Sequence, residues 1–495
     1  MVDASGTAPT RPRRMVDRTR WDLETDVAIV GFGGAGACAA IEAAGSGADV
    51  TIFELASASG GSTALSSAEV YMGGSGGTRV QRACGYEDST EVMFRYLMAA
   101  GGDLADEAKV RFYCEGSVEH FEWLVAMGAP YKDTECRERA IMALTDDCLL
   151  YTGNEQCWPF RQLARPCPRG HNLEVEGDNG GPLLMRILTD RVVESGVRVW
   201  YDARALTLIV GDDGAVHGLV VRIDGEERNV RARKGVLLCA GGFAMNPAMV
   251  ERYCPRLASG RLPIGNPGDT GSGILMGMGV GAAVIHMNEA FITLPYYPPA
   301  SLTYGIFVNA QGQRFINEDC YHARVAYHAI RQVGRGIYLV VGADDYAHPR
   351  FLNADIAGTG ETIEELAREI GVDPQMLRHT VEFYNEHAAA GLDPLFHKSP
   401  EWLKPMQAPY AALDCTPGSG VLYPYFTLGG LDTLPTGEVR AVDGRVIPGL
   451  YAAGRTACGV PRSAAGYASG LSVGDATFFG RVAGGRAAEA PRREL

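Results

Sequence analysis

The sequence predicts an α/β fold, in which a parallel sheet flanked by helices is interrupted by a separate α+β cap. Three observations support this prediction. An apolar run, a glycine turn, an alanine-rich segment and a second apolar run follow one another over residues 26–54. Two later apolar runs, at 234–243 and 449–455, also end in glycines. Residues 276–420, between them, are rich in proline and aromatic residues and lack this rhythm. The chain is therefore expected to leave its first domain and return to it.

The N-terminal elements form a predicted βαβ unit. The run DVAIVG (26–31) is short, apolar and β-branched, which is typical of a buried parallel strand. The alanine-rich segment 31–48 predicts a helix, and DVTIFE (49–54) predicts the second strand. A helix between two strands completes the crossover that parallel strands need. Residues 1–21 are polar and basic without an apolar core segment, so we expect a flexible leader rather than a signal peptide.

The remaining elements follow from periodicity and turn residues. Residues 104–128 predict a pair of amphipathic helices, and 182–196 predicts a helix that ends at a glycine. The segment 198–223 alternates around a D-D-G turn, which indicates a hairpin. The charged segment 362–372 predicts a solvent-exposed helix. The predicted domains are a nucleotide-binding domain made of 22–275 and 421–495, and an inserted domain over 276–420.

Composition excludes several classes of function. The chain has 495 residues, a net charge of −14 and no basic stripe, which argues against nucleic acid as a partner. No apolar run approaches the 18 residues of a membrane span. The twelve cysteines show no CxxC pair and no metal-ligand spacing, so we predict no metal site. Scattered, reduced thiols in so large a chain indicate a cytoplasmic protein.

The glycine turn after the first strand predicts a nucleotide site. GFGGAG places glycines at 31, 33 and 36, matching G-x-G-x-x-G between a strand and a helix. These glycines permit a tight turn, close approach to a pyrophosphate and close helix–strand packing. The helix start then offers free N–H groups to the phosphates. Glu54 ends the second strand, 18 residues past Gly36, where it is placed to accept hydrogen bonds from a ribose.

Several later segments favour FAD over an exchangeable NAD. A second Gly/Ser/Thr loop (58–71) follows Glu54 and would extend the cradle toward the far half of a long cofactor. CAGGF and YAAGR add glycine-ended strands that could contact the same molecule. The predicted cofactor-binding residues are Gly31, Gly33, Gly34, Ala35, Gly36, Glu54, Gly61, Ser62, Thr63, Ala205, Ala240, Gly241, Asp269, Gly454, Gly470, Leu471 and Ser472.

These features together resemble the FAD-dependent fumarate reductase/succinate dehydrogenase flavoprotein superfamily, over about residues 24–485. The shared motifs are GFGGAG, the GGST loop, KGVLLCAGGF, GDTGSGI, GQRFINED and GLYAAG. Within the superfamily the chain is most similar to the 3-ketosteroid Δ4-(5α)-dehydrogenases, through TGNEQCWPF, PRGH, NEDCYHAR and GYASG. The resemblance implies a Rossmann-like FAD-binding domain with an inserted substrate-binding and catalytic domain.

The steroid dehydrogenase resemblance also implies roles for three residues. In that family a 3-keto-5α-steroid loses a proton from C4 and a hydride from C5. The matching positions make Tyr467 the group at the ketone oxygen, Ser469 the base, and Tyr321 its assistant and proton route. A phenol can stabilise a developing enolate, whereas a serine is a poor base without a neighbouring group. The expected substrate contacts are Phe291, Tyr296, Tyr321, Tyr467 and Gly470.

The expected partners are a small hydrophobic ketone and an electron acceptor, and three alternative functions stay open. An ene-reductase would use the same groups in reverse, and a non-catalytic flavoprotein would use none of them. A dicarboxylate reductase would need the arginine of N-E-x-x-x-R, but His322 stands there and Arg324 comes two residues later. Arg455 follows YAAG, where many relatives have an acidic residue.

Overall fold

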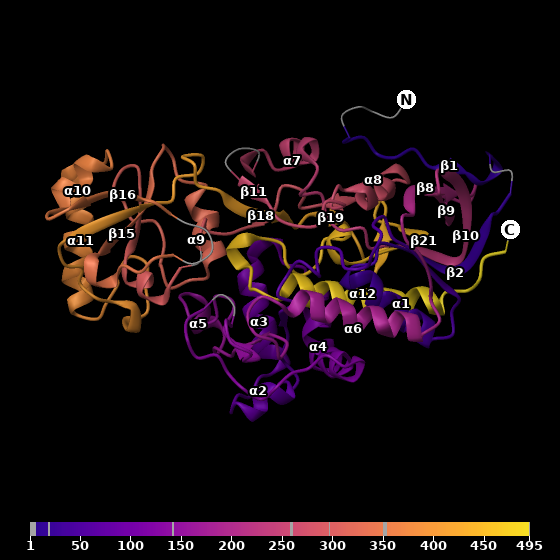
Figure 1. Ribbon diagram of the computed structural model, residues 1–495, viewed down its shortest axis with the longest axis horizontal. Coiled ribbons are helices and arrows are strands. Elements are labelled where there is room, and N and C mark those ends of the chain that lie inside the picture. Colours follow the sequence, from indigo (N-terminus) through magenta and orange to yellow (C-terminus); the bar gives the residue numbers. More distant parts are fainter. Residues whose placement is uncertain are drawn as a thin grey trace.

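The computed structural model describes residues 6–17, 20–140, 143–257, 261–296, 298–349 and 354–494. Its elements form an elongated molecule with a large sheet at one end and a smaller, four-stranded sheet at the other (Figure 1). Helices α1 (Gly34–Gly45) and α12 (Leu471–Glu489) lie between them in the middle of the view (Figure 1). The first described strand, β1 (Arg13–Arg14), and the chain that follows α12 both lie at the end of the molecule that holds the large sheet (Figure 1). The prediction of a mixed α/β fold is confirmed.

The large sheet has nine strands and contains the predicted βαβ unit. Strands β2 and β3 pair in parallel on either side of the connection through α1. The chain returns to this sheet late, because β21 pairs in parallel with β10. The D-D-G turn joins β8 and β9, as the hairpin prediction requires. The strands are β1 (Arg13–Arg14), β2 (Leu23–Val30), β3 (Val50–Phe53), β7 (Arg198–Trp200), β8 (Arg204–Val210), β9 (Val216–Ile223), β10 (Glu226–Leu238), β20 (Glu438–Arg440) and β21 (Val446–Ala452).

Helices α1 and α12 pack closely because glycines of α12 face the α1 backbone. A Cβ atom at Gly480 would lie 2.4 Å from the Ala35 carbonyl oxygen, and one at Gly484 would lie 2.2 Å from that of Ala39. Any side chain at either position would therefore clash with the backbone of α1. Helix α6 (Gly180–Glu194) lies beside this pair (Figure 1).

The inserted segment forms its own sheet and core. Four antiparallel strands lie in the order β14-β15-β17-β16, and α10 and α11 cover them. Helix α10 begins at a capping box formed by Thr362 and Glu365, close to the predicted helix start. The elements are β14 (Ile306–Asn309), α9 (His322–Ala329), β15 (Ile337–Gly342), β16 (Ile356–Gly360), α10 (Ile363–Glu369), α11 (Pro374–Ala389) and β17 (Tyr410–Asp414). The domain boundaries themselves stay a prediction.

Smaller elements connect these bodies. The three-stranded sheet of β11 (Arg261–Pro263), β13 (Ala290–Ile292) and β18 (Tyr423–Thr427) lies between the large sheet and the inserted lobe (Figure 1). One long helix, α4, occupies the segment where a helix pair was expected. The other elements are β4 (Val70–Tyr71), α2 (Arg79–Ala83), α3 (Thr90–Gly101), α4 (Glu107–Met127), β5 (Leu149–Leu150), α5 (Phe160–Leu163), β6 (Gly170–His171), α7 (Pro247–Tyr253), α8 (Ser272–Gly279), β12 (Val284–Ile285) and β19 (Gly430–Leu431).

The N-terminal segment differs from the flexible leader that the sequence indicated. Within residues 6–17, β1 pairs with β8, and the Thr10 amide donates to the Leu275 carbonyl at 2.9 Å. The Arg13 guanidinium donates to the Asn229 side chain at 2.8 Å and to Glu227 at 2.8 Å. The basic side chains that suggested a solvated leader therefore attach this segment to the sheet. Residues 1–5 and 18–19 lie outside the described part of the chain.

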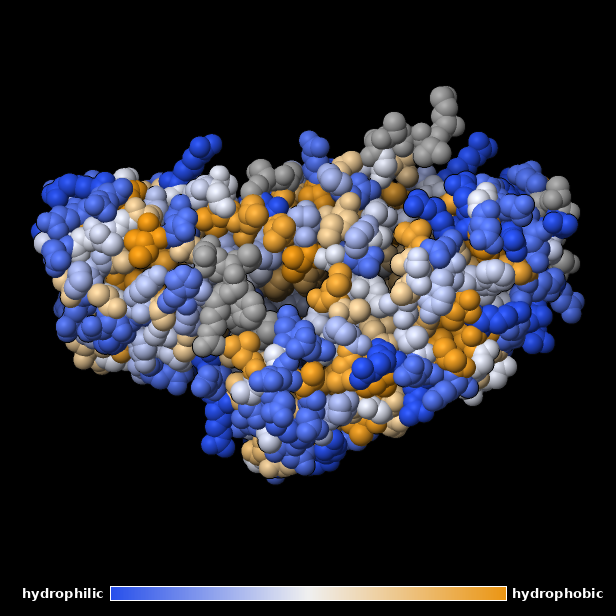
Figure 2. Space-filling model, in the orientation of Figure 1, coloured by the Kyte–Doolittle hydropathy of each residue, from blue (hydrophilic) through white to orange (hydrophobic). Residues whose placement is uncertain are grey.

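The surface is mixed in polarity. Figure 2 shows hydrophobic residues around a hollow near the centre of this face, between the two ends of the molecule. No helix among the described residues is both long enough and apolar enough to span a bilayer.

Candidate active site

The predicted glycine turn forms a narrow cradle at the start of α1. Gly31 has φ +101°, and a Cβ atom there would lie 2.4 Å from the Cys239 carbonyl oxygen. A Cβ atom at Gly36 would lie 2.0 Å from the Gly31 carbonyl oxygen. Glycine is therefore required at both positions. Gly33 forms the N-cap of α1, so the free N–H groups of the first turn begin at this cradle.

The second loop closes over the first. A Cβ atom at Gly61, whose φ is +53°, would lie 3.2 Å from the Gly33 Cα. The Gly34 amide donates to the Thr63 hydroxyl at 3.1 Å. Ala35 faces Gly454, where an added Cβ would lie 3.1 Å from the Ala35 Cβ. Residues distant in sequence thus meet around the α1 N-terminus.

The Ser62–Asp269–Arg455 cluster extends the cradle. The Arg455 guanidinium donates to Asp269 Oδ2 at 2.6 Å and to Ser62 Oγ at 2.7 Å. The other Asp269 oxygen, Oδ1, is buried without a hydrogen-bond partner among the described residues. That orphaned acceptor and the open helix N-terminus fit a cofactor with both hydroxyl and phosphate groups. An added Cβ at Gly241, with φ +76°, would fall 2.4 Å from this same oxygen.

The structure shows the surroundings of two predicted cofactor contacts, Glu54 and Ala205. The Glu54 carboxylate follows β3 and accepts from the Phe32 amide at 2.6 Å and the Ala56 amide at 2.8 Å. It therefore fixes the turn of the cradle, and it stays the predicted ribose contact. Ala205 lies inside β8, paired with Val221 of β9. Ala203 donates its amide to the Glu54 carbonyl at 2.9 Å, and Ala205, two residues later, stays a predicted cofactor contact.

The GYASG turn lies directly before α12, and its backbone geometry requires glycine. Gly470 has φ +88°, and a Cβ there would lie 2.8 Å from the Tyr71 amide nitrogen. The Tyr467 hydroxyl donates to Ser472 Oγ at 2.9 Å. Burial raises the pKa of Tyr467 to about 12, while the hydroxyl and backbone N–H of Ser472 act in the opposite direction. The helix start therefore favours negative charge on the Tyr467 oxygen.

Ser469 stands between two other buried groups. Its side chain is close enough to Tyr321 and to Glu69 to lower the pKa of each. Its backbone is fixed by two contacts with Thr152, an amide-to-carbonyl bond at 2.9 Å and a bond from the Thr152 hydroxyl at 2.9 Å. Burial nevertheless raises the pKa of Tyr321 well above its ordinary value, so this phenol keeps its proton.

Tyr321 reaches this position from the inserted segment, just before α9. Its amide donates to the Asn154 side chain at 2.9 Å, and its ring lies 6.4 Å from the Tyr467 ring. The neighbouring His322 contacts the Thr293 hydroxyl, and burial lowers the pKa of His322 to about 3. The Arg324 guanidinium donates to the Ala465 carbonyl at 3.2 Å. His322 and Arg324 thus hold the loop around Tyr321.

Aromatic side chains form one wall of the site. The Phe291 ring lies 4.5 Å from Tyr467 and stacks on Phe426 at 4.7 Å. The predicted contact Phe291 therefore lies beside the catalytic turn. Tyr296 is buried elsewhere on the same segment, with its hydroxyl 4.0 Å from the Cys415 sulfur. Among the described residues, Phe291 lies with the three hydroxyl residues, whereas the Tyr296 hydroxyl faces Cys415.

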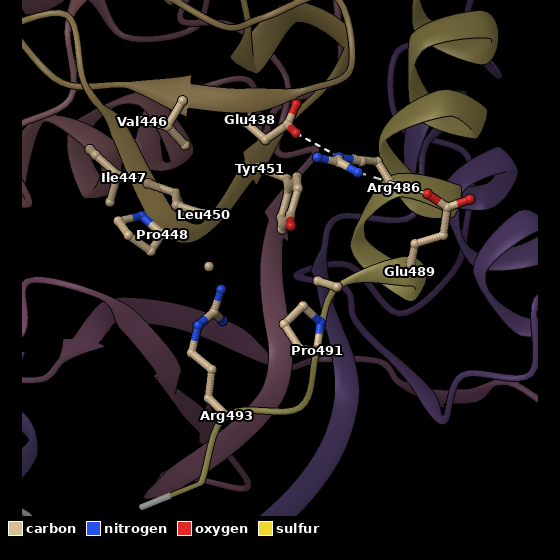
Figure 3. A pocket seen from close by; sticks show the side chains of 12 residues that line it. Glu438, Val446, Ile447, Pro448, Leu450, Tyr451, Arg486, Glu489, Pro491 and Arg493 are labelled. Carbon is tan, nitrogen blue, oxygen red and sulfur yellow. Dashed lines mark hydrogen bonds and ion pairs between the residues drawn. The ribbon is translucent and has the colours of Figure 1, made fainter.

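A separate surface cavity of about 270 Å³ lies between β21 and the end of α12 (Figure 3). Arg486 pairs there with Glu438 at 2.7 Å, and Arg493 points toward the same hollow from the opposite side. None of the residues predicted to bind cofactor or substrate lines this cavity.

Sequence reasoning missed Glu69, Asn154 and Arg455 as parts of the site, whereas Asp269, the partner of Arg455, was among the predicted cofactor contacts. Glu69 follows a run of alanine and serine, where no motif marks it. Only the structure shows that Glu69, directly before β4, lies against the GYASG turn. Asn154 lies within the TGNEQC motif that carried the resemblance, so its motif was recognised without its role.

Comparison with known proteins identifies the family of the chain. The FAD binding domain family matches residues 26–471. The crystal structure of 3-ketosteroid-Δ4-(5α)-dehydrogenase from Rhodococcus jostii RHA1, in complex with 4-androstene-3,17-dione, is 43% identical, with a TM-score of 0.91. That match covers 97% of this chain and 100% of the other.

More distant relatives fall into two groups. The 3-oxo-5-alpha-steroid 4-dehydrogenase of Comamonas testosteroni is 27% identical, over 88% of this chain and 94% of its own. A fumarate reductase (cytochrome) of Shewanella frigidimarina is 28% identical, over 94% of this chain and 77% of its own. The chain therefore belongs to the FAD-binding flavoprotein oxidoreductases and, within them, to the family of the 3-ketosteroid-Δ4-(5α)-dehydrogenases.

Proposed function

We propose that this enzyme oxidises a 3-keto-5α-steroid to the 4-ene, with loss of a proton from C4 and a hydride from C5. The meeting of the Tyr467, Ser469 and Tyr321 side chains at the start of α12 carries this proposal. The family relative from Rhodococcus jostii was crystallised with 4-androstene-3,17-dione, which is the product of such a reaction. The aromatic wall around Phe291 suits an apolar ring system.

Each hydroxyl has a distinct task in this reaction. When the substrate binds, the single hydroxyl proton of Tyr467 turns from Ser472 Oγ to the C3 ketone oxygen and stabilises the enolate charge as the C4 proton leaves. Ser469, two residues later, removes that proton. Tyr321 orients the Ser469 hydroxyl, and Asn154 holds Tyr321 in place through its backbone amide. The buried surroundings exclude water, which strengthens each of these hydrogen bonds.

FAD accepts the hydride when it is bound, and this chain supplies its cradle. Gly31, Gly33 and the α1 N-terminus would hold the pyrophosphate, while Glu54 would hold the ribose. Ser62, Asp269 and Arg455 would contact the middle of the cofactor. The electron acceptor that reoxidises the flavin is proposed only as a class, a diffusible oxidant or carrier.

Two rival functions make different predictions. A dicarboxylate reductase needs a free arginine to deliver a proton, but Arg324 donates to a backbone carbonyl and lies over the Phe160 ring. Fumarate should therefore not reoxidise the reduced enzyme. An ene-reductase would use the same hydroxyls in the opposite direction, because the groups that remove a proton can also return it.

One experiment tests the proposed direction. The holoenzyme is mixed without oxygen with the 5α-saturated counterpart of 4-androstene-3,17-dione, and flavin absorbance is followed. Bleaching of the oxidised flavin supports dehydrogenation. Reoxidation of pre-reduced enzyme by the 4-ene, with no response to the saturated ketone, would overturn it in favour of an ene-reductase.

We also propose a cytoplasmic location. All twelve cysteines are free thiols, and ten of them are buried. Persistent free thiols are typical of a reducing compartment. Cell fractionation with a tagged chain would test this proposal.

A further inference from the structure

Ser469 alone is too weak a base for the proposed reaction. A serine hydroxyl ionises far above neutral pH, so it needs a neighbour that can take its proton. Burial keeps the Tyr321 phenol protonated, so Tyr321 can relay a proton but carries no negative charge of its own. An ionised group beside Ser469 would supply the basicity that these two hydroxyls lack.

Glu69 is a buried carboxyl beside this serine. Its side chain is 1% exposed, and neither of its oxygens has a hydrogen-bond partner of normal geometry among the described residues. It lies on the segment that enters β4, where Gly470 packs: a Cβ there would fall 3.2 Å from the Glu69 carbonyl carbon. Glu69 Oε1 and the Thr152 hydroxyl both face Gly170, where an added Cβ would lie 2.6 Å and 2.7 Å from them, and that hydroxyl donates to the Ser469 carbonyl. A buried carboxyl normally has partners, so an orphaned one beside a catalytic hydroxyl needs an explanation.

The second carboxyl in this region is already engaged. Glu155 accepts from the Tyr71 hydroxyl at 2.7 Å and from the Gly153 amide at 3.0 Å. Both of its oxygens are thus occupied by fixed donors. Of the two, only Glu69 has both carboxylate oxygens without a donor among the described residues.

We propose that Glu69 is the proton acceptor of the reaction and acts through the Ser469 hydroxyl. This inference rests on the proposed dehydrogenation. As the C4–H bond breaks, the proton passes to Ser469 Oγ, and the Ser469 hydroxyl proton passes to a Glu69 carboxylate oxygen. The C4–H electron pair forms the C4=C5 bond while the hydride leaves C5 for FAD. Glu69 ends neutral and releases its proton before the next turnover.

The surroundings of Glu69 set the pH range in which it can act. Burial raises its pKa to about 8, the Ser469 side chain lowers it, and the carboxyls of Glu155 and Asp178 raise it further. Tyr321 and Tyr467 also face it, and both are neutral phenols in this range. The base form is the ionised one, so the rate should rise with pH. From pH 7 to pH 9 the ionised fraction of such a group grows about tenfold.

The test follows anaerobic flavin reduction of the holoenzyme by the saturated ketone between pH 6 and pH 10. The wild type should accelerate with pH and level off above the pKa of Glu69. Glu69→Gln keeps the shape of the side chain but cannot accept the proton. It should reduce the rate about 10²–10⁴-fold and remove the rising limb. Glu69→Asp retains a carboxyl at a greater distance and should regain part of the rate together with the limb.

Asp178→Asn is the matched control, because it removes a neighbouring acid that has no hydrogen bond to the site. Its plateau rate should stay near that of the wild type, and its rising limb should remain, shifted to a slightly lower pH because one neighbouring negative charge is gone. An unchanged rate and limb in Glu69→Gln would overturn the role of Glu69. If Glu69→Gln fails to retain FAD, Glu69→Asp decides: a flat pH profile in that variant would also overturn it. A wild type that the saturated ketone cannot reduce would instead refute the proposed function.

Discussion

Replacing Tyr467 with phenylalanine separates the chemistry of this residue from its packing. The ring contacts with Phe291 and Phe426 would remain, and only the hydroxyl would be lost. Loss of one donor at a developing oxyanion costs about 2.7–4 kcal/mol, or 10²–10³-fold in rate. The lost bond to Ser472 costs only about 1 kcal/mol of stability. Stopped-flow bleaching of the flavin by the saturated ketone gives the rate, and thermal unfolding gives the stability.

The Ser472→Ala variant is the comparison that makes this result interpretable. It removes the partner of Tyr467 and costs a similar amount of stability, but it leaves the phenol beside the ketone. The rate should then fall by less than about tenfold, since one neutral hydrogen bond contributes about 1 kcal/mol. If Tyr467→Phe reduced the flavin as fast as the wild type, the assignment of Tyr467 to the ketone oxygen would be refuted.

Three further predictions concern the turn and the sheet. Ser469→Ala should slow flavin reduction about 10²–10⁴-fold while the FAD content, measured by absorbance, stays unchanged; loss of FAD would indicate a structural role instead. Gly470→Ala should lower the free energy of unfolding by about 1–3 kcal/mol, because φ is +88° and the new Cβ would lie 2.8 Å from the Tyr71 amide nitrogen; an unchanged denaturation midpoint would contradict this. Asp26 is held by Arg492 and Arg233, and its pKa in the folded state is lowered to about 2. Ionised Asp26 therefore stabilises the folded state fully above the unfolded pKa of about 3.9, and this contribution is lost as the pH falls toward 2. Arg492→Ala should accordingly make acid unfolding begin at a higher pH.

The cofactor cradle could be predicted because its geometry is local. G-x-G-x-x-G between a strand and a helix requires glycine at Gly31 and Gly36, and the structure gives the steric reason at each position. The βαβ unit and the 198–223 hairpin followed from apolar runs and turn residues in the same way. These signals depend on neighbours in sequence, so one chain is enough to detect them.

The catalytic site depends on contacts that join distant segments. Tyr321 and Ser469 are brought together by packing, and only a family resemblance identified them in advance. Glu69 carries no local signal, because a glutamate after serines usually lies on the surface. The leader was misjudged for a related reason: its arginines look solvated in sequence, yet Arg13 finds Asn229 and Glu227 on the sheet.

The close packing of α12 against α1 fixes the distance between the phosphate cradle and the GYASG turn. Gly480 is level with Ala35 at the start of α1, and the catalytic turn at Gly470 lies ten residues earlier. At 1.5 Å per residue, the ten residues from Gly480 back to Gly470 span about 15 Å. The hydroxyls of Tyr467 and Ser469 therefore lie about this far from the phosphate end of the site. The number of α12 residues between Gly470 and Gly480 thus sets the distance between the cradle and the reacting groups. Inserting or deleting one helical turn there should move the hydroxyls along the cofactor and leave the phosphate cradle where it is.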